Sequence, residues 1–245
     1  MNQKYRLPAA PDVASLPRRL RGSLLAALLL TGWTATAQTA DPVPDAAFRS
    51  VIRHYTDSVG ESANLYRGLE YIWPSQGTRG HPFFGTDSAQ SGSVWYDGVL
   101  YVGVPLLYDA FSDLLLLRNK SNLNIQLFTG KVTAFTLGSH RFERLPTGYY
   151  EVLYEGRCRR LLAQHSKTSS SVRSDEPLRF TPASRYYVQD GDRLLLLNGR
   201  KAVYRYFSKQ KTALRKYARE NRLDFKNNFG RSLVQAFAAF DPSTP

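Results

Sequence analysis

The sequence predicts a mainly β protein: an antiparallel meander, barrel-like or folded as a sandwich, with an N-terminal helix and C-terminal helices packed on it. From residue 93 to residue 207, short apolar and aromatic runs recur at regular spacing with turn residues between them, a pattern typical of meanders. No helical segment separates these runs, so a parallel sheet with crossover helices is not expected. Amphipathic helical patterns flank the runs on both sides.

The predicted strands are short and bounded by turn signals. Asp97-Gly98 joins the runs SVWY and VLYV as a two-residue hairpin, because both positions tolerate a positive φ. Asn198-Gly199 is expected to do the same, so that residues 93–207 form one continuous antiparallel sheet. The polar, Ser-rich residues 164–177 are expected to be a loop. Further strands are expected at residues 105–108, 113–118, 123–128, 132–137, 141–145, 149–154, 157–164, 185–188, 193–197 and 201–207.

Three helices are expected outside the meander. The first covers residues 45–58, where apolar residues recur at helical spacing. Ser208 is expected to cap a second helix that runs to about Asn221. The third covers residues 231–240 and has four apolar residues at core spacing, so it is expected to pack on the sheet: Leu233, Val234, Phe237 and Phe240.

The first 37 residues have the order of a secretory signal peptide. A basic leader precedes the apolar residues 23–33, and Ala35-Thr36-Ala37 is an A-x-A cleavage site. The apolar run is shorter than the roughly 18 residues that span a bilayer. We therefore expect cleavage after Ala37 and export to the periplasm or the cell exterior, with residues 38–245 forming a single domain that has no transmembrane segment. The leader's cations are Lys4, Arg6, Arg18, Arg19 and Arg21.

The cysteine content and the net charge limit the cellular environment and the kinds of partner that we expect. Cys158 is the only cysteine, so no intramolecular disulfide can form and the domain must depend on its core; Cys158 itself is expected to be buried. The formal net charge is +13, which attracts polyanions. Export makes an anionic envelope polymer or an envelope protein the expected partner, rather than nucleic acid.

One cationic stripe stands out in the predicted C-terminal helix. Lys211, Arg215, Arg219 and Arg222 recur at i, i+4, i+8 and i+11 and share one side of the helix. Like charges at this spacing repel by a few tenths of a kcal/mol per pair. The stripe therefore needs either carboxylates from the sheet or an anion from outside, and we expect it to face solvent and bind an anionic polymer.

Aromatic residues are the second candidate binding feature. Trp95, Tyr96 and Tyr101 crowd the first hairpin. Neighbours such as Tyr149 and Tyr150 are expected to point to opposite faces of a one-sided sheet. Some of these rings should then be exposed, where they can stack on sugars or on a partner protein. Cross-strand pairing of tyrosines within the sheet is the structural alternative.

No specific catalytic, metal or cofactor signature is present, so neither a catalytic residue nor a cofactor is predicted. The four histidines are scattered, without the close spacing of metal ligands. Ser208 and Lys211 formally match S-x-x-K, but the partner motifs of penicillin-recognising enzymes are missing. A glycoside hydrolase would need two carboxylates across a cleft. The carboxylates that could meet in the meander are Asp97, Asp109, Asp113 and Glu151.

Three short aromatic motifs carry a resemblance. They are Asn64-Leu65-Tyr66-x-Gly68-x-Glu70-Tyr71, Gly92-x-Val94-x-Tyr96-Asp97-Gly98 and Leu107-Tyr108-Asp109. Together they resemble a pattern of exported Bacteroidota proteins of unassigned activity, over most of the chain after residue 37. The resemblance implies an envelope location and transfers no catalytic residue.

The expected function is therefore binding or scaffolding of a cell-envelope component by a non-enzymatic exported protein. The alternative is a hydrolase of polysaccharide or peptidoglycan with an unrecognised site. The two differ in geometry, since a hydrolase needs a cleft with converging carboxylates or histidines. A binder can use an aromatic or cationic surface.

Overall fold

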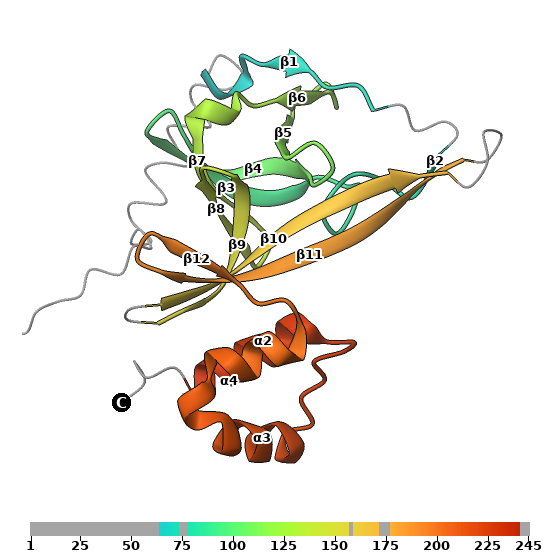
Figure 1. Ribbon diagram of the computed structural model, residues 1–245. Helices are drawn as coiled ribbons and strands as arrows, with labels where there is room; N and C mark the ends of the chain where they lie inside the picture. Colours follow the sequence, from blue (N-terminus) through green and yellow to red (C-terminus); the bar gives the residue numbers. More distant parts are fainter. Residues whose placement is uncertain (1–63, 74–77, 157–158, 172–176, 241–245) are drawn as a thin grey trace, which may run out of the picture. The chain divides into compact units, whose positions relative to one another are not determined.

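The computed structural model describes residues 64–73, 78–156, 159–171 and 177–240. The expected signal peptide, the helix at residues 45–58 and Cys158 lie outside these ranges. Strand is the commonest secondary structure of the described chain (Figure 1). The strands are β1 (Leu69–Glu70), β2 (Thr78–Arg79), β3 (Gln90–Tyr96), β4 (Val99–Asp109), β5 (Leu114–Arg118), β6 (Asn124–Gln126), β7 (Val132–Leu137), β8 (His140–Leu145), β9 (Gly148–Glu155), β10 (Arg159–Ser170), β11 (Leu178–Asp190) and β12 (Arg193–Leu196).

The described strands form one twelve-stranded sheet in the order β1-β6-β5-β4-β3-β7-β8-β9-β10-β11-β12, with β2 paired to β11. Consecutive strands from β3 to β6 and from β7 to β12 are antiparallel neighbours, so the predicted meander is confirmed. The β3–β7 pair joins the two runs, and β2 pairs with β11 in parallel. Within the described chain β1 and β12 end the sheet, which is not closed into the barrel that was one expected form.

The Asp97-Gly98 hairpin is confirmed. Both residues have positive φ, 53° and 77°, and Tyr96 pairs with Val99 across the turn. The expected break at Pro105 is absent, because β4 runs without interruption to Asp109.

The expected hairpin at Asn198-Gly199 is wrong. β12 ends at Leu196, and helix α2 (Gly199–Tyr206) begins at Gly199 with Asn198 in the position before it. Residues 201–207, expected as a strand, are therefore helical up to Tyr206. Val203 and Phe207 are buried four residues apart, so helical spacing places both in the same core. A strand that followed a hairpin at this point would also place Val203 and Phe207 on one face, but it would leave Leu197 exposed. In the structure Leu197 is buried in the same core as these two residues.

The expected loop at residues 164–177 is wrong for residues 164–170, which are strand. β10 continues to Ser170 and β11 begins at Leu178, with Ser170 paired to Arg179. The polar side chains of this arm are mostly exposed. A two-stranded ribbon without a core to cover needs no apolar face, and for that reason its sequence resembles that of a loop.

The C-terminal helices pack on the sheet as expected. After α2, a 3₁₀ turn (Ser208–Gln210) leads into α3 (Lys211–Glu220), and α4 (Phe229–Phe240) is the last helix. Ser208 does not cap α3, because the N-cap residue of that helix is Gln210. The side chain of Gln210 makes no capping hydrogen bond. α4 contacts β9 and β10. No helix in the described ranges has the length and apolarity needed to cross a bilayer.

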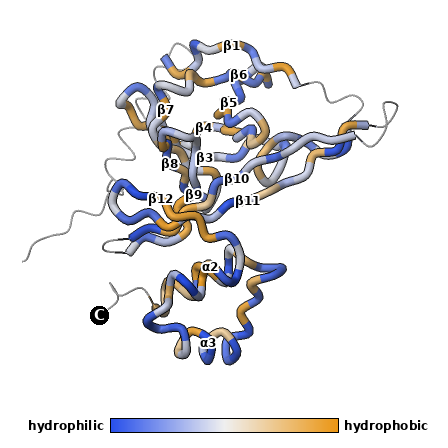
Figure 2. Tube along the Cα trace, in the orientation of Figure 1, coloured by the Kyte–Doolittle hydropathy of each residue, from blue (hydrophilic) through white to orange (hydrophobic). Residues whose placement is uncertain are grey.

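The buried residues form two main cores. The first lies within the sheet and joins residues of β3 to β9 such as Tyr96, Phe135 and Phe142. The second joins strand residues Leu161 and Val188 to the helices. Hydrophobic and hydrophilic stretches are mixed along the strands, whereas α3 is largely hydrophilic (Figure 2).

Tyr149 and Tyr150 are both buried, contrary to the expectation that one would be exposed. Tyr149 belongs to the first core. Tyr150 points to the other face, where its ring meets Tyr187 at 5.6 Å and its hydroxyl contacts Thr147 at 2.7 Å. Both faces of β9 are covered, so alternation along the strand exposes neither ring.

Candidate functional site

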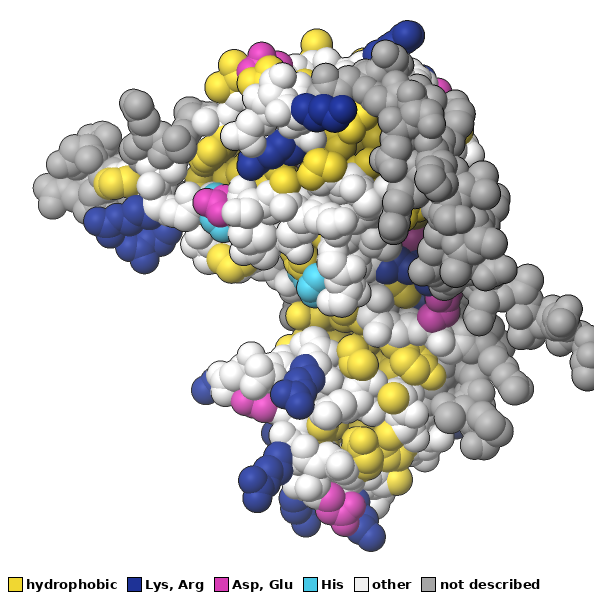
Figure 3. All heavy atoms as spheres, turned by 180° about the vertical axis from the view of Figure 1, so that it is seen from behind, with side chains coloured by type: hydrophobic (Ala, Val, Ile, Leu, Met, Phe, Trp, Pro, Cys, Tyr) yellow, Lys and Arg dark blue, Asp and Glu magenta, His cyan; other side chains and the backbone are white. Residues whose placement is uncertain are grey.

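Positive charge is concentrated at the C-terminal end of the chain. Residues 197–240 hold eleven lysines and arginines against two acidic residues, Glu220 and Asp224, whereas residues 64–196 hold fifteen against twelve. Basic side chains are spread over the helical part of the molecule in Figure 3. The excess of positive charge is therefore a property of the helices and their connections.

These helices enclose a pocket of about 610 Å³. α2 contributes two of its residues, α3 contributes three, and the segment after α3 closes it. Four of the lining side chains are cationic and one is acidic. The lining residues are Arg200, Tyr204, Arg215, Ala218, Arg219, Leu223, Asp224, Phe225 and Lys226.

Tyr204 stands at the centre of the cationic lining. The guanidinium carbons of Arg200 and Arg215 lie over its ring, 5.5 Å and 5.6 Å from the centroid. Phe225 packs against the same tyrosine edge-on, at 6.1 Å between centroids. A cation over an aromatic face is stabilised by about 0.5–1 kcal/mol at an exposed site. The ring therefore contacts two like charges without neutralising either.

The single acidic side chain of the pocket offsets only one of its four cationic charges. Asp224 Oδ1 accepts hydrogen bonds from the backbone N–H groups of Lys226 and Asn227, at 2.9 Å and 3.0 Å, and Oδ2 accepts one from the Asn227 side chain at 2.8 Å. These bonds, first that from the Asn227 backbone, lower the pKa of Asp224. The carboxylate is committed to its own loop, so the pocket keeps an excess of positive charge.

The predicted cationic stripe divides in two. All four of its members are exposed, but only Arg215 and Arg219 line the pocket, while Lys211 and Arg222 do not. No ion pair joins any of the four to a carboxylate within the described ranges; the pair on α3 is Lys216–Glu220, at 3.9 Å. Sequence reasoning missed Arg200 and Lys226, which lie on other elements and meet the stripe only in the folded chain.

The three aromatic candidates differ in their solvent exposure. Trp95 is 40% exposed, but Tyr96 and Tyr101 are 1% and 6% exposed and belong to the first core. Of the three candidate rings, Trp95 is therefore the one whose side chain is exposed. Alternation along β3 turns Trp95 outward and Tyr96 inward, and Tyr101 lies on the inner side of β4.

The chain matches no known protein family, no curated protein and no solved structure. The resemblance of its aromatic motifs to exported Bacteroidota proteins therefore stays a prediction. Many of the residues that carry it have structural roles. Tyr96, Tyr108 and Asp109 are buried, and Asp97 and Gly98 form the hairpin turn.

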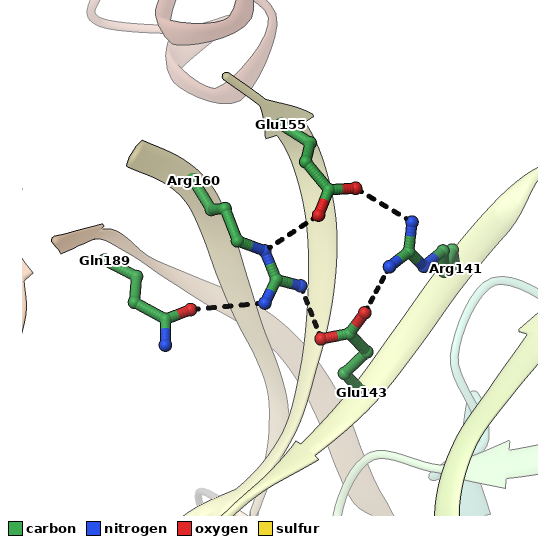
Figure 4. Close-up of polar contacts among 5 residues, drawn as sticks. All are labelled: Arg141, Glu143, Glu155, Arg160 and Gln189. Carbon is green, nitrogen blue, oxygen red and sulfur yellow. Dashed lines mark hydrogen bonds and ion pairs between the residues drawn. The ribbon is translucent and has the colours of Figure 1, made fainter. Parts of the chain in front are cut away.

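The strand region neutralises much of its own charge. Arg160 pairs with Glu143 and Glu155, and Arg141 pairs with the same two carboxylates, so that the four side chains form a closed ring across β8, β9 and β10 (Figure 4). Gln189 of β11 accepts a further hydrogen bond from Arg160 at 3.5 Å. The ring is neutral, so its arginines are not available to an external anion.

The sheet also brings together residues that are scattered in the sequence. Glu151 Oε1 contacts His140 Nδ1 at 2.5 Å, and Oε2 contacts His165 Nε2 at 2.6 Å. His81 is placed elsewhere, with its Nδ1 3.3 Å from Lys167 Nζ. Strand register, which is not readable from histidine spacing, creates the Glu151 cluster. No group of three or more His, Cys, Asp or Glu side chains in the described ranges has the arrangement of a metal site.

The other candidate carboxylates are each bound by a different partner. Asp97 pairs with Lys131 at 2.7 Å. Asp109 accepts from the hydroxyl of Tyr71 at 2.8 Å, and Asp113 from that of Tyr108 at 2.7 Å.

Proposed function

We propose that the protein is an exported envelope protein that binds an anionic envelope component in the pocket between α2, α3 and the segment after α3. The observation that carries the proposal is the composition of this pocket. Arg200, Arg215, Arg219 and Lys226 converge on it, and its one carboxylate is occupied by its own loop. Like charges held together in this way are stabilised by an anion that they share.

The lining favours a phosphate-bearing ligand with an uncharged portion. Guanidinium groups bind phosphate through two parallel hydrogen bonds, and three of the four cations are arginines. Leu223, Phe225 and Tyr204 supply apolar and aromatic surface beside them. At about 610 Å³ the pocket has the size of a small-molecule site. A phosphorylated sugar or lipid headgroup of the envelope fits this combination of charge and apolar surface.

The decisive experiment compares two double variants with equal loss of charge. Arg215→Gln/Arg219→Gln removes two pocket cations, and Lys211→Gln/Arg222→Gln removes two exposed cations that do not line the pocket, one at the start of α3 and one just after its end. Binding of the chain without residues 1–37 is measured by fluorescence anisotropy on lipopolysaccharide micelles. We expect the first variant to weaken binding at least tenfold and the second to weaken it by less than about threefold, since screening limits distant charges.

Equal losses from both variants would contradict the pocket and leave only diffuse charge attraction. A fall in thermal stability of the first variant with unchanged binding would contradict the ligand role altogether. Only weak stabilising contacts are lost in that variant, chiefly the one between Arg215 and Tyr204, so the folded state should persist.

Export is part of the proposal, and its support is the order of charge, apolar run and A-x-A site in residues 1–37. N-terminal sequencing of the native protein should give Gln38 as the first residue. A mature product that keeps residues 1–37 would place the protein in another compartment, and the envelope ligand would have to be abandoned.

A further inference from the structure

Three side chains on neighbouring strands form a hydrogen-bonded series that leads from a buried carboxylate to an exposed hydroxyl. Glu151 of β9 contacts His165 of β10 through Oε2 and Nε2, 2.6 Å apart. His165 Nδ1 lies 2.8 Å from the hydroxyl of Ser184 on β11. His165 and Ser184 are direct partners in the β10–β11 pair, so the backbone register holds the imidazole and the hydroxyl opposite each other.

The charge on Glu151 sets the direction of each hydrogen bond. Burial alone would raise the pKa of Glu151, but the hydrogen bonds from His165 and His140 outweigh it and the pKa is lowered. An ionised carboxylate can only accept, so His165 Nε2 donates to it. In the neutral imidazole Nδ1 is then the acceptor, and the Ser184 hydroxyl must donate to it. The nitrogen that faces the serine is then the one without a proton, as a general base requires. The ring is reversed relative to the serine–histidine–aspartate triad, in which Nε2 faces the serine.

Solvent access changes along the series in the order that nucleophilic catalysis needs. The side chain of Glu151 is 9% exposed and that of His165 is 16% exposed, whereas Ser184 is exposed. Phe84 covers both imidazoles, with ring centroids 4.8 Å from His165 and 5.0 Å from His140. The carboxylate and base are shielded from water, while the hydroxyl can be reached by a substrate.

We propose that Ser184 is the nucleophile of an acyl-transfer site for carboxylic esters, with His165 as general base and Glu151 as the residue that positions it. Ser184 Oγ forms a bond to the ester carbonyl carbon while its proton passes to His165 Nδ1. The bond between that carbon and the leaving alkoxide breaks, and the alkoxide takes the proton from His165. Water then attacks the acyl-serine, giving its proton to His165, and the carboxylic acid is released as Ser184 regains a proton.

An ester suits this site better than an amide, because an alkoxide leaves more readily than an amine. None of the three residues lines the pocket between α2 and α3. The proposed acyl-transfer site therefore does not depend on the proposed binding function, and each can be tested without the other.

The test uses a fluorophosphonate probe and p-nitrophenyl acetate on the chain without residues 1–37. We expect the probe to phosphonylate Ser184, as identified by mass spectrometry of the digested protein, and ester hydrolysis to be lost in Ser184→Ala. Ser166→Ala is the matched control, since Ser166 is an exposed serine on the adjoining strand. His165→Gln should slow labelling about a hundredfold, the usual contribution of a general base. Labelling of the parent should fall in acid, where a protonated imidazole accepts no proton.

Two results would overturn the proposal: labelling of Ser184 no faster than that of Ser166, or unchanged ester hydrolysis in Ser184→Ala. The serine variant is decisive by itself, because Ser184 is exposed and its replacement leaves the folded core intact. Should His165→Gln fail to fold, the pH dependence of Ser184 labelling in the parent protein tests the base directly. A labelling rate that does not change with pH would exclude His165 from that role.

Discussion

The hydroxyl of Tyr71 donates a hydrogen bond of 2.8 Å to Asp109, a carboxylate that is completely buried. The second oxygen of Asp109 accepts from the backbone N–H groups of Phe111 and Ser112, at 2.8 Å and 3.0 Å. Tyr71 comes directly after β1 and Asp109 ends β4, so this bond ties the start of the described chain to a turn of the sheet. Burial and the carboxylate raise the pKa of Tyr71 far above its ordinary value, which keeps the hydroxyl protonated as donor.

Tyr71→Phe should lower the free energy of unfolding by about 1–3 kcal/mol, because it leaves one oxygen of a buried carboxylate without its donor. Urea denaturation followed by tryptophan fluorescence measures the loss. Tyr217→Phe is the control, since the hydroxyl of Tyr217 makes no hydrogen bond within the described residues and its ring contact with Phe240 is kept. An equal loss of unfolding free energy in the two variants would show that the Tyr71–Asp109 hydrogen bond does not contribute to stability as we expect.

Gly92→Ala should destabilise the protein by more than about 2 kcal/mol. A Cβ atom at this position would stand 2.0 Å from the backbone oxygen of Thr136 and 3.2 Å from a methyl group of Leu106. Relief requires separation of β3 from β7, which is the pair that joins the two halves of the sheet, and overpacking of this kind is costly. Gly130→Ala meets no atom within 4 Å and should leave the thermal midpoint almost unchanged.

Stability should fall in acid in a way that depends on Glu151. Its pKa is lowered in the folded protein by the two histidines that face it, His140 and His165. A carboxyl group whose pKa is lowered by folding stabilises the folded protein at any pH above its pKa in the unfolded chain, which is about 4.3 for glutamate. This contribution is lost as the pH falls through the pKa of the folded state. Free energies of unfolding measured from pH 6 to pH 3 should therefore decline more steeply in the parent than in Glu151→Gln. Parallel curves would contradict the role assigned to this carboxylate.

The charge ring of Figure 4 should respond unequally to removal of its two carboxylates. Glu143→Gln should cost about 1–2 kcal/mol, because it removes hydrogen bonds to both Arg141 and Arg160 in a partly buried position. Glu155→Gln should cost less than about 0.5 kcal/mol, since the Glu155 side chain is 49% exposed and exposed ion pairs contribute little. Thermal denaturation of both variants at low and at high salt tests the ranking.

Local turn chemistry predicted one dipeptide correctly and another wrongly. Asp97-Gly98 lies between two strands that each have partners on both sides, and it forms the hairpin. Asn198-Gly199 has the same positive-φ glycine, but the second core, where Val203 and Phe207 meet residues of α4, decides the structure of the next segment. The dipeptide marks a change of chain direction, and tertiary packing determines whether a strand or a helix comes next.

The candidate sites were predictable only where they are local in sequence. Helical spacing predicted Arg215 and Arg219, because neighbours on a helix face are three or four residues apart. Arg200 and Lys226 join them through the packing of separate elements. Glu151, His165 and Ser184 come from three strands whose register is set by bulges and turn lengths, including the irregularity between Leu161 and Leu162 in β10. The spacing of residues along the chain does not predict such a register.

Because residues 64–196 are nearly balanced in charge and residues 197–240 are strongly basic, the described chain is an electric dipole whose positive pole is its helices. An anionic surface attracts the helical end more strongly than the nearly balanced strand end, so it exerts a torque on an approaching molecule. At physiological ionic strength the torque acts within a Debye length of about 8 Å. The protein would arrive already turned, with its helices leading, because the two arginines of the charge ring on the strands are matched by two glutamates and add no net charge to the other end.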